Sequence, residues 1–214
     1  MTHGGLAGKM FLILHDPFTG KPGVSQEQIK YGLVAAALAD LVMQGRLRME
    51  NGHLSVAASR GPAPDDVGAF LLKGIQGRPH DITRSWLEGF TELGYELVAR
   101  GLVAGGVVRR EQGRRLMRRS PDRFPAVDLL RAAGPRVRLE HMLRSPHDLD
   151  LAGAALASII NGLGLERVLD VDRERAAVKK AIAAAATHLP TDLRSLVDDV
   201  SAAVAEVPLT FRRL

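Results

Sequence analysis

One short pattern occurs twice in this sequence and constrains how its surroundings can fold. Residues 41–52 and 102–113 align without a gap and share LVxxGxxRxExG. In this pattern the leucine and valine end a helical stretch, and the first glycine stops the helix. The residues that follow form a strand leading to a glycine-containing turn, which in the second copy is expected at Glu111-Gln112-Gly113. The repetition predicts two helix–hairpin units. Coincidence is the alternative, because helix ends and hairpins reuse the same residue types.

The second copy carries the charge of the chain. The segment from position 109 to 123 contains seven arginines and two acidic residues, Glu111 and Asp122, so its net charge is 7 − 2 = +5. This equals the net charge of all 214 residues. The arginines are Arg109, Arg110, Arg114, Arg115, Arg118, Arg119 and Arg123. A solvated face is the common explanation for a run of charge, but this localisation favours a polyanionic partner.

Composition excludes several classes of protein. The chain has no cysteine, so thiol catalysis and disulfides are excluded, which fits a reducing compartment.

The longest apolar stretch, residues 151–165, contains Ser158, Asn161 and three glycines, whereas a bilayer span needs about 20 apolar residues. The N-terminal apolar run is too short for a signal peptide. We therefore expect a cytoplasmic protein whose membrane contact, if any, is peripheral and on the inner face. The preference for arginine over lysine favours a GC-rich bacterial genome.

Apolar periodicity predicts a mainly α protein with two short β-hairpins, folded as one domain over residues 1–214. A capping box at Ser25 and Gln28 opens a largely buried helix, and Asn51-Gly52 is a hairpin turn. Asp65 is expected to cap the helix that follows this hairpin. Asp148 or Asp150 is expected to start the apolar helix that reaches Asn161. Helical patterns cover residues 26–44, 66–76, 82–101 with a bend at Gly94, 127–131, 137–143, 172–188 and 191–207.

Three His-Asp pairs raise the question of an enzyme. They are His15-Asp16, His80-Asp81 and His147-Asp148. Metal phosphohydrolases use such pairs with further ligands at helical spacing, and no HxxxH or HExxH pattern occurs in the sequence. Each pair also lies at a chain break or helix start, where aspartate is a routine cap. We therefore predict no catalytic residue, no metal and no cofactor.

A winged helix is the alternative interpretation of a helix followed by a basic hairpin, because arginine suits nucleic-acid phosphate. The helix before the basic hairpin carries Glu88, Glu92 and Glu96, which DNA would repel. Sequence-specific nucleic-acid binding is therefore disfavoured, and non-specific binding through the arginines stays open.

Several segments, in order along residues 6–207, resemble one known family. They are Gly32-Leu33, Leu38-Ala39-Asp40-Leu41, residues 44–50, Ser85-Trp86-Leu87-Glu88, residues 97–108 and residues 145–150. The sequence is similar in these segments to the Golgi phosphoprotein 3 family, whose eukaryotic members are peripheral membrane proteins that bind phosphatidylinositol 4-phosphate. The resemblance implies a helical core with a protruding β-hairpin used for membrane contact and homo-oligomerisation, as in an adaptor for membrane trafficking or organisation. The client proteins are not indicated.

The sequence departs from the family at its phosphoinositide pocket. Ser25, Val34, Thr91 and Gly94 align with the tryptophan and three arginines of the family pocket, so those binding roles do not carry over. We expect the same scaffold with a more electrostatic contact to anionic lipid. The expected lipid-binding residues are the seven arginines together with Lys30 and Arg84, which are basic side chains near the family pocket. Leu116, Met117 and Phe124 are expected to insert into the membrane.

Overall fold

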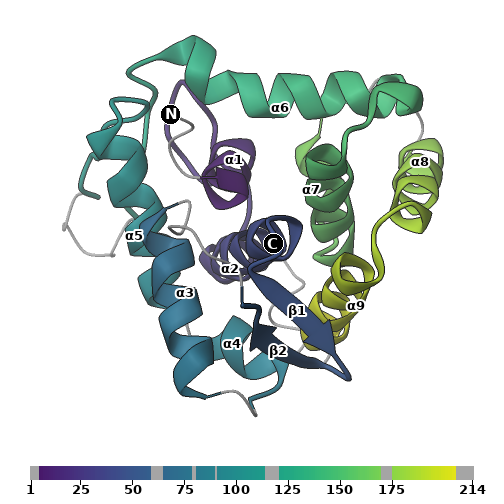
Figure 1. Cartoon of the computed structure of the whole chain (residues 1–214). Helices are drawn as coiled ribbons and strands as arrows, with labels where there is room; N and C mark the ends of the chain where they lie inside the picture. Colours follow the sequence, from purple (N-terminus) through teal and green to yellow (C-terminus); the bar gives the residue numbers. More distant parts are fainter. Residues whose placement is uncertain are drawn as a thin grey trace.

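The computed structural model describes residues 5–58, 65–78, 81–89, 91–113, 121–169 and 175–205. It confirms the mainly α fold class (Figure 1). The helices are α1 (Gly5–Leu14), α2 (Gln26–Met43), α3 (Asp66–Gly77), α4 (Thr83–Gly89), α5 (Thr91–Ala104), α6 (Leu129–Arg144), α7 (Leu151–Gly162), α8 (Arg175–Thr187) and α9 (Thr191–Ala205). Strands β1 (Leu47–Glu50) and β2 (His53–Val56) form a two-stranded sheet. The prediction of one domain over residues 1–214 stays a prediction.

Helix α2 is the centre of the fold. Its capping box is formed as predicted, with the Gln28 amide donating to Ser25 Oγ and the Ser25 amide donating to Gln28 Oε1, both at 3.2 Å. From Ile29 to Leu41 its apolar side chains are buried all round. In Figure 1 the helix has α1 above it, α3 and α5 on one side, α4 below, and α7 and α9 on the other side. A helix that is apolar on every face has to be enclosed in this way.

The apolar segment that opens the chain is helix α1, and side chains from other elements satisfy both of its ends. Asp40 of α2 accepts a hydrogen bond from the Leu6 amide at 3.0 Å. The Arg136 guanidinium of α6 donates to the Ile13 carbonyl (3.2 Å from Nε) and to the His15 carbonyl at 3.4 Å. A buried helix leaves unpaired amides and carbonyls at its ends, and these two side chains provide their partners. Arg136 thereby fixes α6 against α1.

One predicted helix boundary is wrong, and another is not tested. The predicted helix over residues 82–101 corresponds to α4 and α5, and Phe90 between them lies outside the described residues, so the predicted bend at Gly94 stays a prediction. The two short helices predicted around Gly134-Pro135 are one continuous helix, α6. Proline inside a helix costs about 3 kcal/mol. In α6 the burial of Ala132 before the proline and of Leu139 and Leu143 after it offsets this cost.

The capping residues and the first hairpin agree with the prediction. Asp65 caps α3, and Asp150 rather than Asp148 caps α7, accepting from the Gly153 amide at 2.6 Å. Strands β1 and β2 pair antiparallel from Leu47↔Val56 to Glu50↔His53. At the turn, Asn51 and Gly52 have φ of 52° and 76°, the left-handed pair that a tight hairpin requires. Leu47, Met49 and Leu54 point inward and join the core.

Candidate functional site: a basic arm

The candidate site is the segment 107–127, called the basic arm below, whose described parts, residues 107–113 and 121–127, pair antiparallel. It begins where α5 stops at Gly106, whose φ is +65°. The Val107 amide donates back to the Leu102 carbonyl at 3.0 Å, as the Arg46 amide does to the Leu41 carbonyl at 2.8 Å where α2 stops. Gly45 has a φ of +64° in that first copy. Both helix ends are thus the same glycine stop, with one bond reaching five residues back.

The pairing of the arm follows the pairing of the first hairpin. Isolated antiparallel bridges join Val108 to Ala126 and Glu111 to Arg123. In the repeat alignment, Val108 and Glu111 correspond to Leu47 and Glu50, which begin and end the ladder of the first hairpin. Residues 51–52 join the strands there, whereas residues 112–122 join them in the arm.

The predicted turn at Glu111-Gln112-Gly113 is therefore wrong. Glu111 and Arg123 exchange two backbone hydrogen bonds, of 2.8 and 2.9 Å, so the chain is still paired at that position. The predicted lipid-binding residues Arg114, Arg115, Arg118 and Arg119, and the predicted inserting residues Leu116 and Met117, lie outside the described residues.

The base of the arm is locked into the core. The Phe124 amide donates to the Gly20 carbonyl and the Ala126 amide to the Pro17 carbonyl, both at 2.9 Å. Gly20, with a φ of +65°, lies so close that an added Cβ would sit 2.2 Å from the Pro125 nitrogen. Only glycine permits both this backbone conformation and this approach.

Phe124 is a core residue, which corrects the expectation that it inserts into a membrane. Its side chain is 1% exposed. Its ring centroid lies 5.2 Å from that of Phe11, 5.9 Å from that of His15 and 6.2 Å from that of Tyr95. Burial of an aromatic ring among three others anchors the returning strand of the arm.

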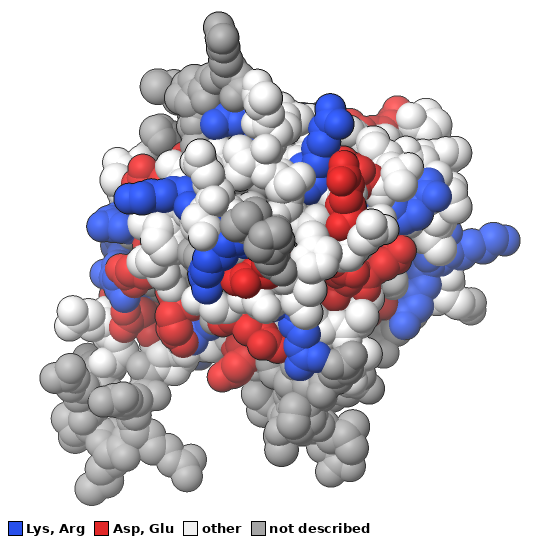
Figure 2. Space-filling view, turned by 60° about the horizontal axis from the view of Figure 1, so that its bottom comes forward, with Lys and Arg blue, Asp and Glu red and all other residues white. Residues whose placement is uncertain are grey.

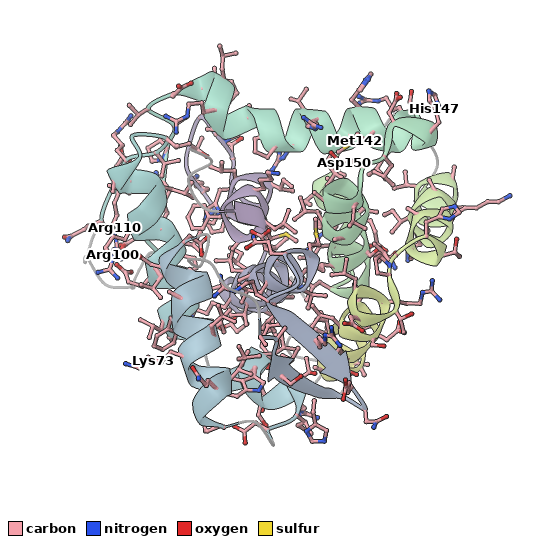
Figure 3. The ribbon with its side chains drawn as sticks, in the orientation of Figure 1. Lys73, Arg100, Arg110, Met142, His147 and Asp150 are labelled. Atoms are coloured by element: carbon pink, nitrogen blue, oxygen red, sulfur yellow. The ribbon has the colours of Figure 1, made fainter. Side chains whose placement is uncertain are left out.

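The two acidic side chains of the arm pair with its first two arginines. Arg109 lies 2.9 Å from Glu111, and Arg110 lies 2.7 Å from both Asp122 and Glu96 of α5. Figure 3 shows Arg110 at the outer edge of the molecule beside α5. The hydrogen bonds that Arg110 donates to the Glu96 and Asp122 carboxylates raise its pKa. Burial raises the pKa of Asp122, but hydrogen bonds from Arg110 and the Gly113 amide outweigh burial and leave that pKa below 3.8. The arm's remaining charge of +5 then belongs to the other five arginines.

One of those five arginines lies within the described residues. Arg123 is exposed, and no ion pair joins it to a carboxylate in the part of the chain that the structure describes. Its neighbour on the paired strand is Glu111, which binds Arg109. Arg123 is therefore available to an external anion.

Lys30 and Arg84 do not join the arm. Lys30 is ion-paired with Glu92 of α5, and Arg84 lies 2.7 Å from Glu88 within α4. The aligned pocket positions Val34 and Gly94 pack together instead of lining a site, because a Cβ on Gly94 would lie 3.1 Å from the Val34 methyl. Each of Glu88, Glu92 and Glu96 is thus ion-paired with a cationic side chain. The sequence did not indicate these pairs, because the partners come from other helical turns or other elements.

The described residues of the His-Asp pairs do not converge on one site. His15 is buried, which lowers its pKa to about 4, and its Nδ1 lies 2.8 Å from the Phe11 carbonyl. Asp16 caps a turn by accepting from the Thr19 amide and hydroxyl at 2.7 Å. His147 and Asp148 lie on the surface, and His80 is outside the described residues. Within those ranges no three metal-ligating side chains cluster. The predictions of no enzyme activity and no metal stay predictions.

Comparisons with family models and with curated proteins address which family the chain belongs to. The family model described as Golgi phosphoprotein 3 (GPP34) matches residues 6–207. A search of curated proteins gives no match. Among the described helices, none has the length and apolar character that crossing a membrane requires. Because the family match covers nearly the whole chain, the protein belongs to the Golgi phosphoprotein 3 family.

Proposed function

We propose that this protein is a peripheral membrane protein that binds anionic phospholipid head groups through the basic arm. The observation that carries the proposal is the distribution of charge in the arm. Its two acidic side chains bind Arg109 and Arg110, which leaves an excess of five arginines in the stretch that ends at Arg123. Arginine offers a fork of donors that matches phosphate oxygens in two-point contacts.

The proposed mechanism combines a rigid base with a charged tip. Phe124 and the close contact with Gly20 hold the base against α1 and α5. A basic residue near an anionic leaflet contributes about 1 kcal/mol, so five give at most about 5 kcal/mol, or a dissociation constant of a few tenths millimolar. Stable binding therefore needs a second contribution. Burial of Leu116 or Met117 would add about 1.5–3 kcal/mol each.

Co-sedimentation with lipid vesicles tests the proposal. We expect binding to vesicles that contain phosphatidylglycerol or a phosphoinositide, weak binding to pure phosphatidylcholine, and a steep loss of binding with added salt. Replacing Arg114, Arg115, Arg118 and Arg119 by glutamine should lower the affinity by about a hundredfold or more.

The control is a second quadruple variant with the same net charge. Arg48, Lys73, Arg167 and Lys180 are exposed and lie on other elements, so their replacement by glutamine changes the charge by the same amount elsewhere. Figure 3 shows Lys73 pointing away from the body of the protein on α3. If the two variants lose binding equally, only net charge matters and the basic arm is not the binding element.

Non-specific nucleic-acid binding is the second candidate, because one structural observation weakens the argument against it. Glu88, Glu92 and Glu96 were expected to repel DNA, but each is ion-paired with a cation. Duplex DNA added to the vesicle assay separates the two candidates. If the parent protein binds DNA and ignores anionic vesicles, the nucleic-acid function replaces the membrane function.

A further inference from the structure

The outward face of α6 combines exposed apolar side chains with arginines. Leu130 is 87% exposed and Val137, two turns later, is 59% exposed. Gly134, His141 and Arg144 continue the same stripe, because positions 130, 134, 137, 141 and 144 alternate steps of four and three. Exposed apolar residues that line up on one helix face are a candidate interaction surface.

The packing of the opposite side fixes this orientation. Ala132, Leu139 and Leu143 are buried, and Arg136 holds α6 against α1 by its hydrogen bonds to the Ile13 and His15 carbonyls. Figure 1 shows α6 running along the top edge of the molecule, above α1 and α7. The stripe therefore points away from the protein body and cannot rotate inward.

The charged residues of α6 are nearly all cationic. Arg131, Arg138 and Arg144 are exposed, whereas the one acidic residue in its sequence, Glu140, is buried. The Asp150 carboxylate lies 2.9 Å from the Arg138 guanidinium and neutralises part of this positive charge. Figure 2 shows a different face, the bottom of Figure 1, where cationic and acidic side chains are mixed.

The apolar character continues toward the basic arm. Val127, directly before the Asp128 cap of α6, is 61% exposed, and Phe18 is 73% exposed in the turn that binds the arm through Pro17 and Ala126. The first turn of α6 is also tied to the start of the arm, because Arg131 donates to the Gly105 carbonyl at 3.1 Å. The N-terminal end of the stripe thus adjoins the base of the basic arm.

We propose that α6 is a second membrane-contact element, which lies along the surface of an anionic bilayer with Leu130 and Val137 immersed and its arginines among the head groups. This inference rests on the proposed membrane function. A helix of 16 residues is about 24 Å long, at 1.5 Å per residue. Helices that bind in this way combine an apolar stripe with flanking lysine or arginine, whose stems lie along the lipid boundary.

A second copy of this chain fits the stripe less well than a bilayer does. A helix that pairs with another helix needs apolar residues at each step of the stripe. The residues at the five positions of the stripe are Leu130, Gly134, Val137, His141 and Arg144. Three of them have no large apolar side chain to pack against a partner helix. Anionic head groups instead complement the arginines, and a fluid interface accommodates the irregular stripe.

Single-cysteine labelling tests the inference directly, because the chain contains no cysteine of its own. Leu130→Cys and Val137→Cys would carry a polarity-sensitive fluorophore. The matched control is Ile82→Cys, which is 48% exposed and precedes α4 at the opposite end of the molecule (Figure 1). With vesicles of phosphatidylcholine and phosphatidylglycerol, we expect a blue shift at positions 130 and 137 and none at position 82.

A functional variant complements the labels. Leu130→Ser with Val137→Ser should lower vesicle affinity about tenfold or more, whereas Ile82→Ser should leave it unchanged. Both positions are exposed, so thermal unfolding of the double variant should match the parent. That match separates lost lipid contact from lost folding.

The outcomes distinguish this inference from the proposed function. If the parent binds vesicles and the arm variant does not, while labels at 130 and 137 stay unshifted, the function stands and the α6 inference is wrong. If the parent does not bind vesicles, the proposed function fails and the inference fails with it. A shift that depends on protein concentration or on duplex DNA, and not on vesicles, would assign the face to a second copy or to nucleic acid.

Discussion

The two helix–hairpin copies begin in the same way and end differently. Both start with a helix stopped at a left-handed glycine, Gly45 or Gly106, and both pair their strands at equivalent positions. In the first copy two residues close the strands and the inner side chains join the core. In the second copy residues 112–122 intervene, and Arg110 stands where the first copy has Met49. One backbone plan thus forms a compact hairpin in the first copy, and in the second it forms a base that is buried in the core and leads into a charged extension.

The shared register is stronger support for a true repeat than the glycine stop. Helix α7 ends with the same stop, because Gly164 has a φ of +69° and the Leu165 amide donates to the Ile160 carbonyl at 2.9 Å. A short 3₁₀ turn, Glu166–Val168, follows α7, and no described strand follows it. Glycine stops recur for purely local reasons, whereas matched cross-strand pairs in two copies require a common three-dimensional arrangement.

The largest expected effect tests whether both copies are anchored by burial. Phe124→Ala should lower the free energy of unfolding by about 3–5 kcal/mol, and Leu54→Ala in the first copy by about 2–5 kcal/mol. Both side chains are fully buried. Urea denaturation measures both effects. If Phe124→Ala left stability unchanged and reduced only vesicle binding, Phe124 would be a lipid-facing residue and the second copy would have no core anchor.

The next effect tests whether the two glycine stops are equivalent. Gly45→Ala and Gly106→Ala should each destabilise by about 1–2 kcal/mol, because an L-residue is strained at positive φ. An added Cβ meets nothing within 4 Å at either position, so the loss reports conformation alone. Thermal unfolding should give similar shifts for the two variants.

Gly101→Ala is the control for this pair. This glycine lies inside α5, and a Cβ there also meets nothing within 4 Å. Alanine should therefore stabilise the protein by up to about 1 kcal/mol. If Gly45→Ala destabilised the protein and Gly106→Ala did not, the two glycine stops would not be equivalent.

The smallest effect concerns the charge pairing found only in the second copy. Asp122→Asn should lower the free energy of unfolding by less than about 1 kcal/mol at neutral pH, because the pair with Arg110 is largely exposed to solvent. The folded-state pKa of Asp122 lies below 3.8, so its contribution is present above that pH and is lost as pH falls through the lowered pKa. Urea denaturation at neutral pH and well below pH 3.8 should show the difference between variant and parent disappear. A difference that persists in acid would show that the Asp122 contribution does not depend on its charge.

Local signals predicted much of the fold. The Ser25 capping box, the Asp65 cap and the Asn51-Gly52 turn lie within four residues of what they control, so the sequence specifies them directly. The continuity of α6 through Pro135 was missed because buried residues on both sides of the proline outweigh its helix-breaking tendency. That balance depends on α1, more than a hundred residues earlier in the chain.

The candidate site was predicted only in part. The concentration of arginines in one segment identified the arm. Its strand pairing was predicted incorrectly, because Gly113 was taken as the turn and the pairing of Glu111 with Arg123 was not expected. Phe124 was expected to be exposed among arginines, because the rings that bury it, those of Phe11, His15 and Tyr95, come from distant parts of the chain. The α6 stripe was available in the sequence as the spacing of Leu130, Val137 and Arg144, and only the buried side of the helix shows which face is free.

The bridge between Glu111 and Arg123 makes the intervening chain exchangeable. Whatever lies between these two residues closes a loop whose ends are already fixed, and doubling the length of such a loop costs only about 0.6 kcal/mol. Insertions, deletions or a foreign peptide grafted between positions 111 and 123 should leave the helical core intact. The same position is therefore a suitable site for grafting engineered lipid probes.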